Sequence, residues 1–204
     1  MRELISAVHP ARVARIVLLL CLPALLFACI SLASDPGQSL KKSPARFQAF
    51  VLLNDLHTEL HDFELLLRRN RLLGILPVDQ LWLQGSEWRS RQHPAYAIPP
   101  REKWPAMLIT LQFVKRELIP LIGPVEVQSG FRTRSYNLAA GGASRSKHME
   151  FSALDLRPQR QYPRELLHRR LKRLWQQRGK HWELGLGLYS GVRFHIDTGG
   201  YRSW

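Results

Sequence analysis

Two histidine–aspartate pairs are the residues of this sequence best suited to chemistry. The first is a His-x6-Asp pair, His148 and Asp155, and the second is a His-x-Asp pair, His195 and Asp197. Two imidazoles and one carboxylate can hold zinc and leave one position open, at which water becomes a nucleophile for amide hydrolysis. Because His and Asp are common residues, the spacing alone also allows ordinary hydrogen-bonded strand residues.

Both pairs are expected on or beside β-strands. In the segment 192–197, apolar side chains alternate with polar ones, so His195 and Asp197 share one face of a strand. In the segment 152–156, Ala153 and Asp155 share a face in the same way. An aspartate flanked by Ala and Leu is costly unless a cation or hydrogen-bond donors receive it.

The cysteine positions narrow the chemistry further. Cys21 and Cys29 are the only two cysteines, and both lie in the apolar run 16–33. The rest of the chain therefore has no disulfide and no thiolate ligand. A metal there must be held by His, Asp or Glu.

The elements that must position these residues indicate an α+β fold with a small, largely antiparallel sheet packed against helices. Residue spacing predicts helices over 47–73, 104–118 and 163–178 and strands over 125–128, 152–156, 184–189 and 192–197. The segment 75–102 is rich in Pro and Trp and is expected to be an irregular arm. The pair Gly185 and Gly187 is expected to let its strand pass close to a neighbour.

The chain begins with features of an export signal. Arg2, Arg12 and Arg15 precede the uncharged run 16–33, which ends in small residues. We expect residues 1–33 to be a signal peptide or membrane anchor and 34–46 a linker. Residues 47–204 then form a single catalytic domain, with an N-terminal helix (47–74), a Pro/Trp-rich arm and helix (75–124) and a zinc-site core (125–204).

The charge of the chain bears on its partners. With 30 Lys and Arg against 16 Asp and Glu, the net charge of the 204 residues is +14. An exported basic protein meets anionic envelope surfaces such as wall polymers and lipid headgroups, so contact with these surfaces is expected. A nucleic-acid partner is not expected. The basic helix after Pro163 could rest on such a surface or simply be a solvated face.

A set of motifs in sequence order makes the chain recognisable. They are Ser129-Gly130-Phe131-Arg132, Tyr136-Asn137, Gly141-Gly142-Ala143, Ser146-x-His148, Ala153-x-Asp155 and His195-Ile196-Asp197-Thr198. Over about residues 75–204 the chain resembles the catalytic domain of the zinc D-alanyl-D-alanine metallopeptidase family, whose members are carboxypeptidases and peptidoglycan endopeptidases. The resemblance implies Zn²⁺ as cofactor, with His148, Asp155 and His195 as its ligands.

The resemblance also implies roles for two further residues. Arg132 would lie beside the zinc and stabilise the oxyanion that forms at the scissile carbonyl. Ser146 would bind substrate or orient His148.

Two departures from the family pattern matter. Phe151 stands where the family has Gly, so the loop before Asp155 could be displaced or the cleft narrowed. Val192 stands where several related enzymes carry an acidic general base. Asp197 is the first candidate for that base, although it could equally fix the tautomer of His195, and Glu183 is a distant third.

The resulting hypothesis is an exported zinc peptidase, located in the envelope or periplasm, that cleaves amide bonds in peptidoglycan stem or cross-link peptides. The alternative is a wall-binding module that keeps the peptidase fold without hydrolysis. A second possible metal pair, His57 and His61, lies one helical turn apart among charged residues and is expected to be a solvated face.

Overall fold

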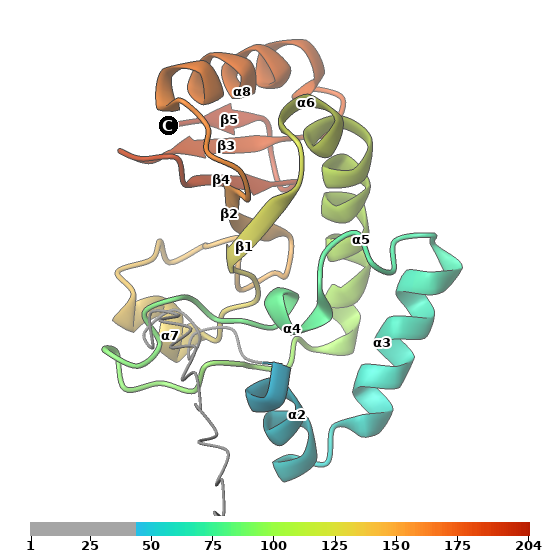
Figure 1. Ribbon diagram of the computed structural model, residues 1–204. Helices are drawn as coiled ribbons and strands as arrows, with labels where there is room; N and C mark the ends of the chain where they lie inside the picture. The colour runs from blue at the N-terminus through green and yellow to red at the C-terminus, as the bar shows by residue number, and fades with distance from the viewer. Residues whose placement is uncertain (1–43) are drawn as a thin grey trace, which may run out of the picture. The chain divides into compact units, whose positions relative to one another are not determined.

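The structure is a computed structural model that describes residues 44–204 (Figure 1). The helices are α2 (Pro44–Leu53), α3 (His57–Arg69), α4 (Val78–Leu81), α5 (Trp104–Phe113), α6 (Ile119–Ile122), α7 (Arg134–Ala139) and α8 (Arg164–Arg178), with a 3-10 turn η1 (Arg101–Lys103) and a π turn η2 (Val114–Leu118). The strands are β1 (Val125–Ser129), β2 (Ala153–Pro158), β3 (Gly185–Leu188), β4 (Phe194–Asp197) and β5 (Arg202–Ser203).

The strands form one mixed sheet in the order β1-β2-β4-β3-β5. Neighbouring strands are antiparallel except for β5, which pairs in parallel with β3. The predicted α+β class with a largely antiparallel sheet is therefore confirmed. β5 itself was not predicted, since two residues at the edge of a sheet give no periodic signal.

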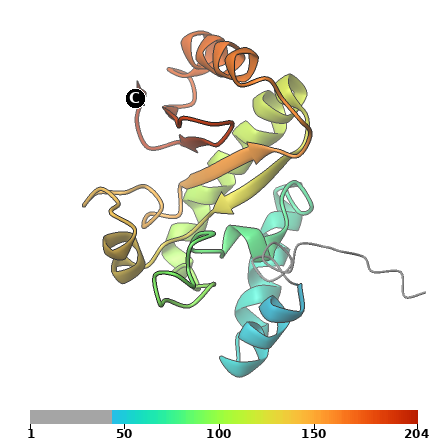
Figure 2. The same cartoon turned by 60° about the vertical axis from the view of Figure 1, so that its left-hand side comes forward.

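Helices pack against this sheet on different sides. α8 contacts β3 and α6, and α4 contacts β1 (Figure 1). Figure 2 shows β1 and β2 side by side with α5 behind them. Thr110 of α5 donates to the carbonyl of Ser152 at 2.9 Å and lies 2.9 Å from the hydroxyl of Thr198, so α5 supports the segments that adjoin β2 and β4.

The predicted N-terminal helix is divided into α2 and α3. Asp55 adopts a left-handed φ of 52°, and the amide of Asn54 donates to the carbonyl of Phe50 at 2.8 Å. Asn and Asp tolerate this conformation and compete for backbone hydrogen bonds, which ends a helix. The apolar spacing continues through the break, so the pattern alone could not reveal it.

The predicted helix over 104–118 extends further than expected. It continues through η2 and α6 to Ile122, and Gly123 then takes a positive φ of 82°. Pro120 lies in the first turn of α6, directly after the π turn. Because the residues before it are also helical, Pro120 lacks an N–H to donate to the preceding turn, and the interruption coincides with the π turn.

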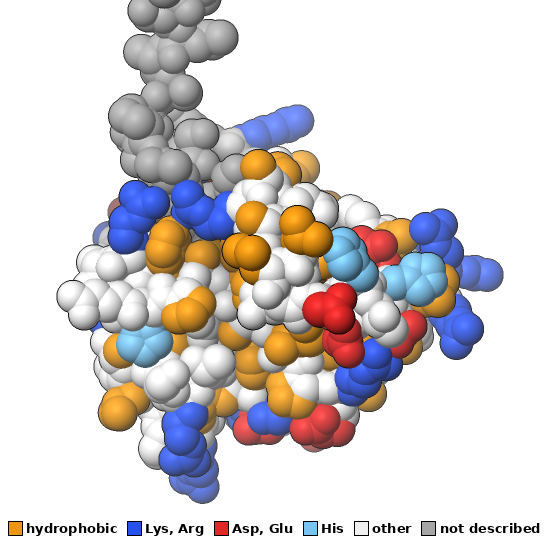
Figure 3. Space-filling view, turned by 90° about the horizontal axis from the view of Figure 1, so that it is seen from below, with side chains coloured by type: hydrophobic (Ala, Val, Ile, Leu, Met, Phe, Trp, Pro, Cys, Tyr) orange, Lys and Arg blue, Asp and Glu red, His pale blue; other side chains and the backbone are white. Residues whose placement is uncertain are grey.

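The face that carries α2 and α3, viewed from below in Figure 3, mixes exposed apolar side chains with acidic and basic ones. Leu52 and Leu53 at the end of α2 are among the exposed apolar side chains. Within residues 44–204, no helix combines the length and apolar character needed to cross a membrane. The predicted signal or anchor (1–33), and all but the last three residues of the predicted linker (34–46), lie outside the described residues.

Candidate metal centre

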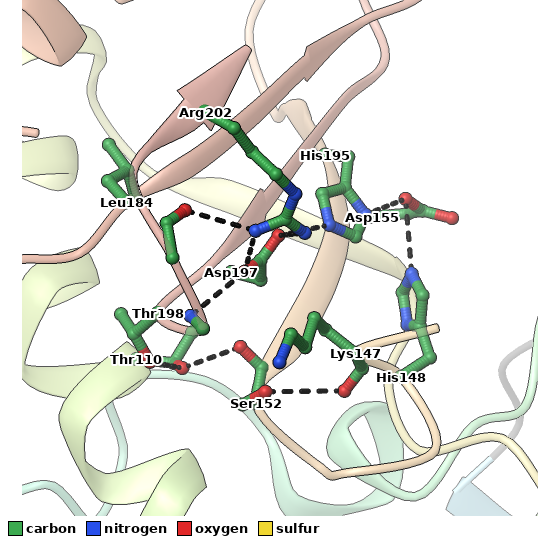
Figure 4. A network of polar contacts seen from close by, with 12 residues as sticks. Thr110, Lys147, His148, Ser152, Asp155, Leu184, His195, Asp197, Thr198 and Arg202 are labelled. Carbon is green, nitrogen blue, oxygen red and sulfur yellow. Dashed lines mark hydrogen bonds and ion pairs between the residues drawn. The ribbon is translucent and has the colours of Figure 1, made fainter. Parts of the chain in front are cut away.

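The carboxylate of Asp155 lies between the imidazoles of His148 and His195 (Figure 4). Its Oδ1 is 3.4 Å from Nε2 of His148 and 3.1 Å from Nδ1 of His195. One ligand atom from each of the three residues lies within 4.8 Å of the other two. All three side chains are buried. The structure thus brings together the residues predicted as ligands, and their occupation by zinc stays a prediction.

The sheet accounts for two of the three positions. Asp155 on β2 and His195 on β4 are direct cross-strand partners, and Ala153 and Asp197 form the neighbouring pair on the same face. His148 comes from the loop before β2, and its carbonyl accepts a hydrogen bond from the backbone N–H of Arg132 at 3.2 Å.

Hydrogen bonds on the far side of each ring fix the orientation of the two imidazoles. Nδ1 of His148 lies 2.8 Å from the carbonyl of Gly130, which can only accept, so Nδ1 carries the proton. Nε2 of His195 lies 3.0 Å from Oδ2 of Asp197, whose carboxylate likewise accepts. In the neutral rings, the remaining nitrogens therefore direct their lone pairs at Asp155. A carbonyl or carboxylate behind a metal-bound histidine orients its ring in this way.

The donor set fits a metal ion. Nε2 of His148 is buried and has no hydrogen-bond partner, which is costly unless a cation receives its lone pair. Burial lowers the pKa of His148, which keeps the ring neutral near pH 7. Two imidazole nitrogens and one carboxylate oxygen are a ligand set that zinc accepts.

The shifts in pKa favour the charged forms of the other two ligand residues, the carboxylate of Asp155 and the imidazolium of His195. Burial acts to raise the pKa of Asp155, but His148 and His195 outweigh it and hold that pKa well below its ordinary value. Burial acts to lower the pKa of His195, yet hydrogen bonds to Asp155 and Asp197 raise it. Protons and a metal ion therefore compete for Nδ1 of His195.

Asp197 lies behind His195, away from the cleft. Its side chain is fully buried, Oδ1 accepts from the N–H of Gly199 at 2.9 Å, and Oδ2 accepts from Nη2 of Arg202 at 2.7 Å. Burial acts to raise its pKa, but the hydrogen bonds from His195 and Arg202 outweigh it, so the pKa of Asp197 is lowered. Of the two roles that the sequence left open, this geometry favours holding the His195 ring over accepting a proton from water.

Asp197 on β4 is packed closely against Gly185, its partner on β3. A Cβ on Gly185 would lie 2.2 Å from Oδ2 of Asp197, so only glycine fits beside this carboxylate. The expectation that these glycines let a strand pass close to its neighbour is confirmed.

Arg132 holds the second oxygen of the Asp155 carboxylate. Its Nη2 donates to Oδ2 of Asp155 at 2.6 Å, and its Nε donates to Oγ of Ser129 at 2.8 Å. The predicted place of Arg132 beside the site agrees with this contact. Its role at the oxyanion stays a prediction.

Tyr189 also belongs to the site, although the sequence motifs did not indicate it. Its hydroxyl donates to Oδ1 of Asp155 at 3.0 Å. Burial and the Asp155 charge raise its pKa far above the ordinary value, so the phenol keeps its proton. Gly187 pairs with His195 across the sheet, and Tyr189 follows two positions later. The sequence feature that could have indicated Tyr189 is the pattern Gly185-x-Gly187-x-Tyr189, with glycines at alternate positions before the tyrosine.

Phe151 does not narrow the cleft as the sequence had suggested. It adopts a left-handed φ of 52° and is fully buried. Its ring lies 5.8 Å from that of Phe63 and 5.9 Å from that of Phe131. The position has the backbone conformation for which glycine is usual, and the phenyl ring packs into the core.

A cleft of about 830 Å³, the His148 cleft, opens onto the two histidines. Its lining includes the predicted Ser146 together with Arg132, Arg145, Lys147 and Arg202. Among the described residues, no Asp or Glu lines this cleft, and neither Val192 nor Glu183 reaches it. His57 and His61 are exposed on α3 and take no part in the centre.

Comparison with known proteins gives the class that this fold and site define. Residues 80–192 match the family model described as Peptidase M15. The match covers more than half of the chain, which therefore belongs to the peptidase M15 family of zinc D-Ala-D-Ala peptidases, as the motifs predicted. Membership makes the protein a metallopeptidase-type hydrolase in general terms. No curated protein and no solved structure matches the chain.

Proposed function

We propose that this protein is a zinc-dependent peptidase that hydrolyses amide bonds in peptidoglycan stem or cross-link peptides. The observation that carries the proposal is the convergence of His148, Asp155 and His195, with both histidines lining an open cleft, in a chain of the peptidase M15 family. When bound, zinc polarises a scissile carbonyl and makes water a nucleophile near neutral pH.

The residues of the chain prepare this chemistry. Gly130 and Asp197 set the ring orientations of the two histidines, and Arg132 and Tyr189 fix the Asp155 carboxylate from two directions. Arg132 lines the cleft as well, so its charge is available to the carbonyl oxygen as it becomes negative. Ser146 lies in the same cleft and is our candidate for substrate binding.

The charge of the cleft supports a peptide ligand that carries carboxylates. Stem peptides of peptidoglycan have such groups along their length, and the basic lining of the His148 cleft complements them. We further propose that the protein is exported to the envelope, either released after cleavage or tethered to the inner membrane by residues 16–33. Its net charge of +14 favours contact with anionic envelope surfaces.

Digestion of purified sacculi tests the proposal. We expect the zinc-loaded full chain to release new muropeptides, which a chelator or His148→Ala abolishes. His57→Ala is the matched control, because it removes an exposed histidine outside the centre and should leave the products unchanged.

One observation favours a second candidate, a wall-binding module without hydrolysis. Among the described residues, the His148 cleft has no acidic side chain that could act as a general base, and Asp197 is enclosed by its partners. Binding of the chain to sacculi with no products at full zinc occupancy would support the module and contradict the peptidase.

A further inference from the structure

The metal centre lies where two cavities meet. The His148 cleft reaches the two histidines, and a second cavity of about 270 Å³, the Asp155 cleft, reaches the aspartate. Four residues line both cavities: Arg132, Gly141, Gly142 and Tyr189. The two cavities therefore adjoin, with the two histidines facing the His148 cleft and Asp155 facing the Asp155 cleft.

This arrangement bears on which bond the site can cut. Removal of one terminal residue needs a closed pocket for that residue on one side of the metal. Cavities that hold drug-sized ligands measure about 300–1,000 Å³. The His148 cleft, about 830 Å³, lies within that range, and the Asp155 cleft, about 270 Å³, lies just below it. Each side is thus larger than a single small residue requires.

The surfaces of the two cavities are chemically different. In the Asp155 cleft, Glu87 forms an ion pair with Arg91, and the Arg193 guanidinium lies 4.3 Å from the centre of the Tyr189 ring. In the His148 cleft, Lys147 lies against Gly199, where an added Cβ would be 2.6 Å from its Cε and 2.9 Å from its Nζ. The absence of a side chain at Gly199 makes room for Lys147, and no acidic residue of the described chain lines that cleft to pair with its ammonium.

We infer that the bond cut is internal, and that the protein is an endopeptidase whose substrate extends into both cavities with a carboxylate facing Lys147. This inference rests on the proposed function and names its substrate class, a cross-linked peptide. In the reaction, the oxygen of one water bonds to the carbonyl carbon and the C–N bond breaks. The departing nitrogen takes both protons of that water, one as the bond breaks and one from the new carboxylic acid, which leaves one carboxylate and one ammonium group.

Two substrates separate the possibilities for the zinc-loaded full chain. One is a muropeptide dimer joined by a peptide cross-link, and the other is a monomer whose stem ends in D-Ala-D-Ala. We expect kcat/KM for the dimer to exceed that for D-Ala release by about tenfold or more. D-Ala release that equals or exceeds dimer cleavage would overturn the inference and leave the proposed function intact. If neither substrate is cut, the proposed function itself fails.

Occupation of the Asp155 cleft can be tested by filling it. Ser86 lines this cleft, whereas Ser90 is exposed nearby and does not. Ser86→Trp should lower kcat/KM for the dimer by about tenfold, and Ser90→Trp should not. Ser86→Trp should also weaken binding of the dimer to the metal-free full chain, measured by calorimetry. Unchanged binding and cleavage in Ser86→Trp would show that the substrate does not enter this cavity.

Lys147 is inferred to determine specificity, so its variants should act on KM. We expect Lys147→Met to raise KM for the dimer about tenfold with little change in kcat, and Lys147→Arg to restore most of the loss. Lys172→Met removes the same charge from α8 outside this cleft and serves as the control. A KM that does not respond to Lys147→Met would overturn the assignment of the carboxylate to this residue.

Discussion

At the scale of single residues, the site depends on two imidazoles whose free nitrogens face one carboxylate. Asp197 orients the second of these rings without reaching the cleft. Asp197→Asn keeps the shape but can present an amide N–H to Nε2 of His195, which would move the ring proton to Nδ1. We therefore expect zinc affinity to fall about 10–100-fold, measured by competition with a chromophoric chelator. An unchanged affinity would contradict the positioning role.

The same residue predicts a pH dependence of stability in the metal-free protein. The pKa of Asp197 is lowered by folding, so its stabilising contribution is present above the unfolded value of about 3.9 and is lost as pH falls through the folded value. The melting temperature of the wild type should exceed that of Asp197→Asn by a constant amount between about pH 5 and 6, and the difference should shrink below about pH 4. Glu102→Gln, which removes an exposed carboxylate on η1, should show no such convergence.

At the scale of elements, the turn between His148 and β2 combines a strained backbone with a buried ring. Phe151→Ala should cost about 3–5 kcal/mol, because it leaves a cavity beside Phe63 and Phe131. Phe151→Gly leaves a similar cavity but removes the left-handed strain of about 1–2 kcal/mol. The glycine variant should thus be more stable than the alanine variant in urea unfolding. The opposite order would show that the turn carries no such strain.

Some elements could be predicted from the sequence more fully than others. Alternation in β4 placed His195 and Asp197 on one face, and the structure shows them in contact. The cross-strand pairing of Asp155 with His195 could not be derived from alternation, because register between distant strands depends on tertiary packing. α7 went unpredicted because it is short, although Thr133 caps it by accepting from the N–H of Tyr136.

The same distinction applies to the site. The ligand set came from ordered motifs and ligand chemistry. The partner of His148 Nδ1 is a backbone carbonyl, that of Gly130, which no side-chain motif can indicate. Tyr189 was missed because its contact with Asp155 depends on strand order. The left-handed conformation at Phe151 was hidden because the residue present is not the one that usually adopts it.

At the scale of the whole molecule, excess positive charge should govern encounter with the wall. The chain carries a net charge of +14. Binding to anionic surfaces of this kind weakens as the Debye length falls from about 10 Å at 0.1 M salt to about 3 Å at 1 M. Retention of the full chain on sacculi should therefore fall steeply over this range in a sedimentation assay. Retention that does not respond to salt would indicate that charge plays no part.

The proposed function requires His148, Asp155 and His195 to hold one metal ion, and metal analysis of the purified full chain tests this most directly. We expect about one zinc per chain in the wild type and in His57→Ala, and almost none in His148→Ala and His195→Ala, with all four proteins folded by circular dichroism. Substoichiometric zinc that is the same in all four would contradict the account.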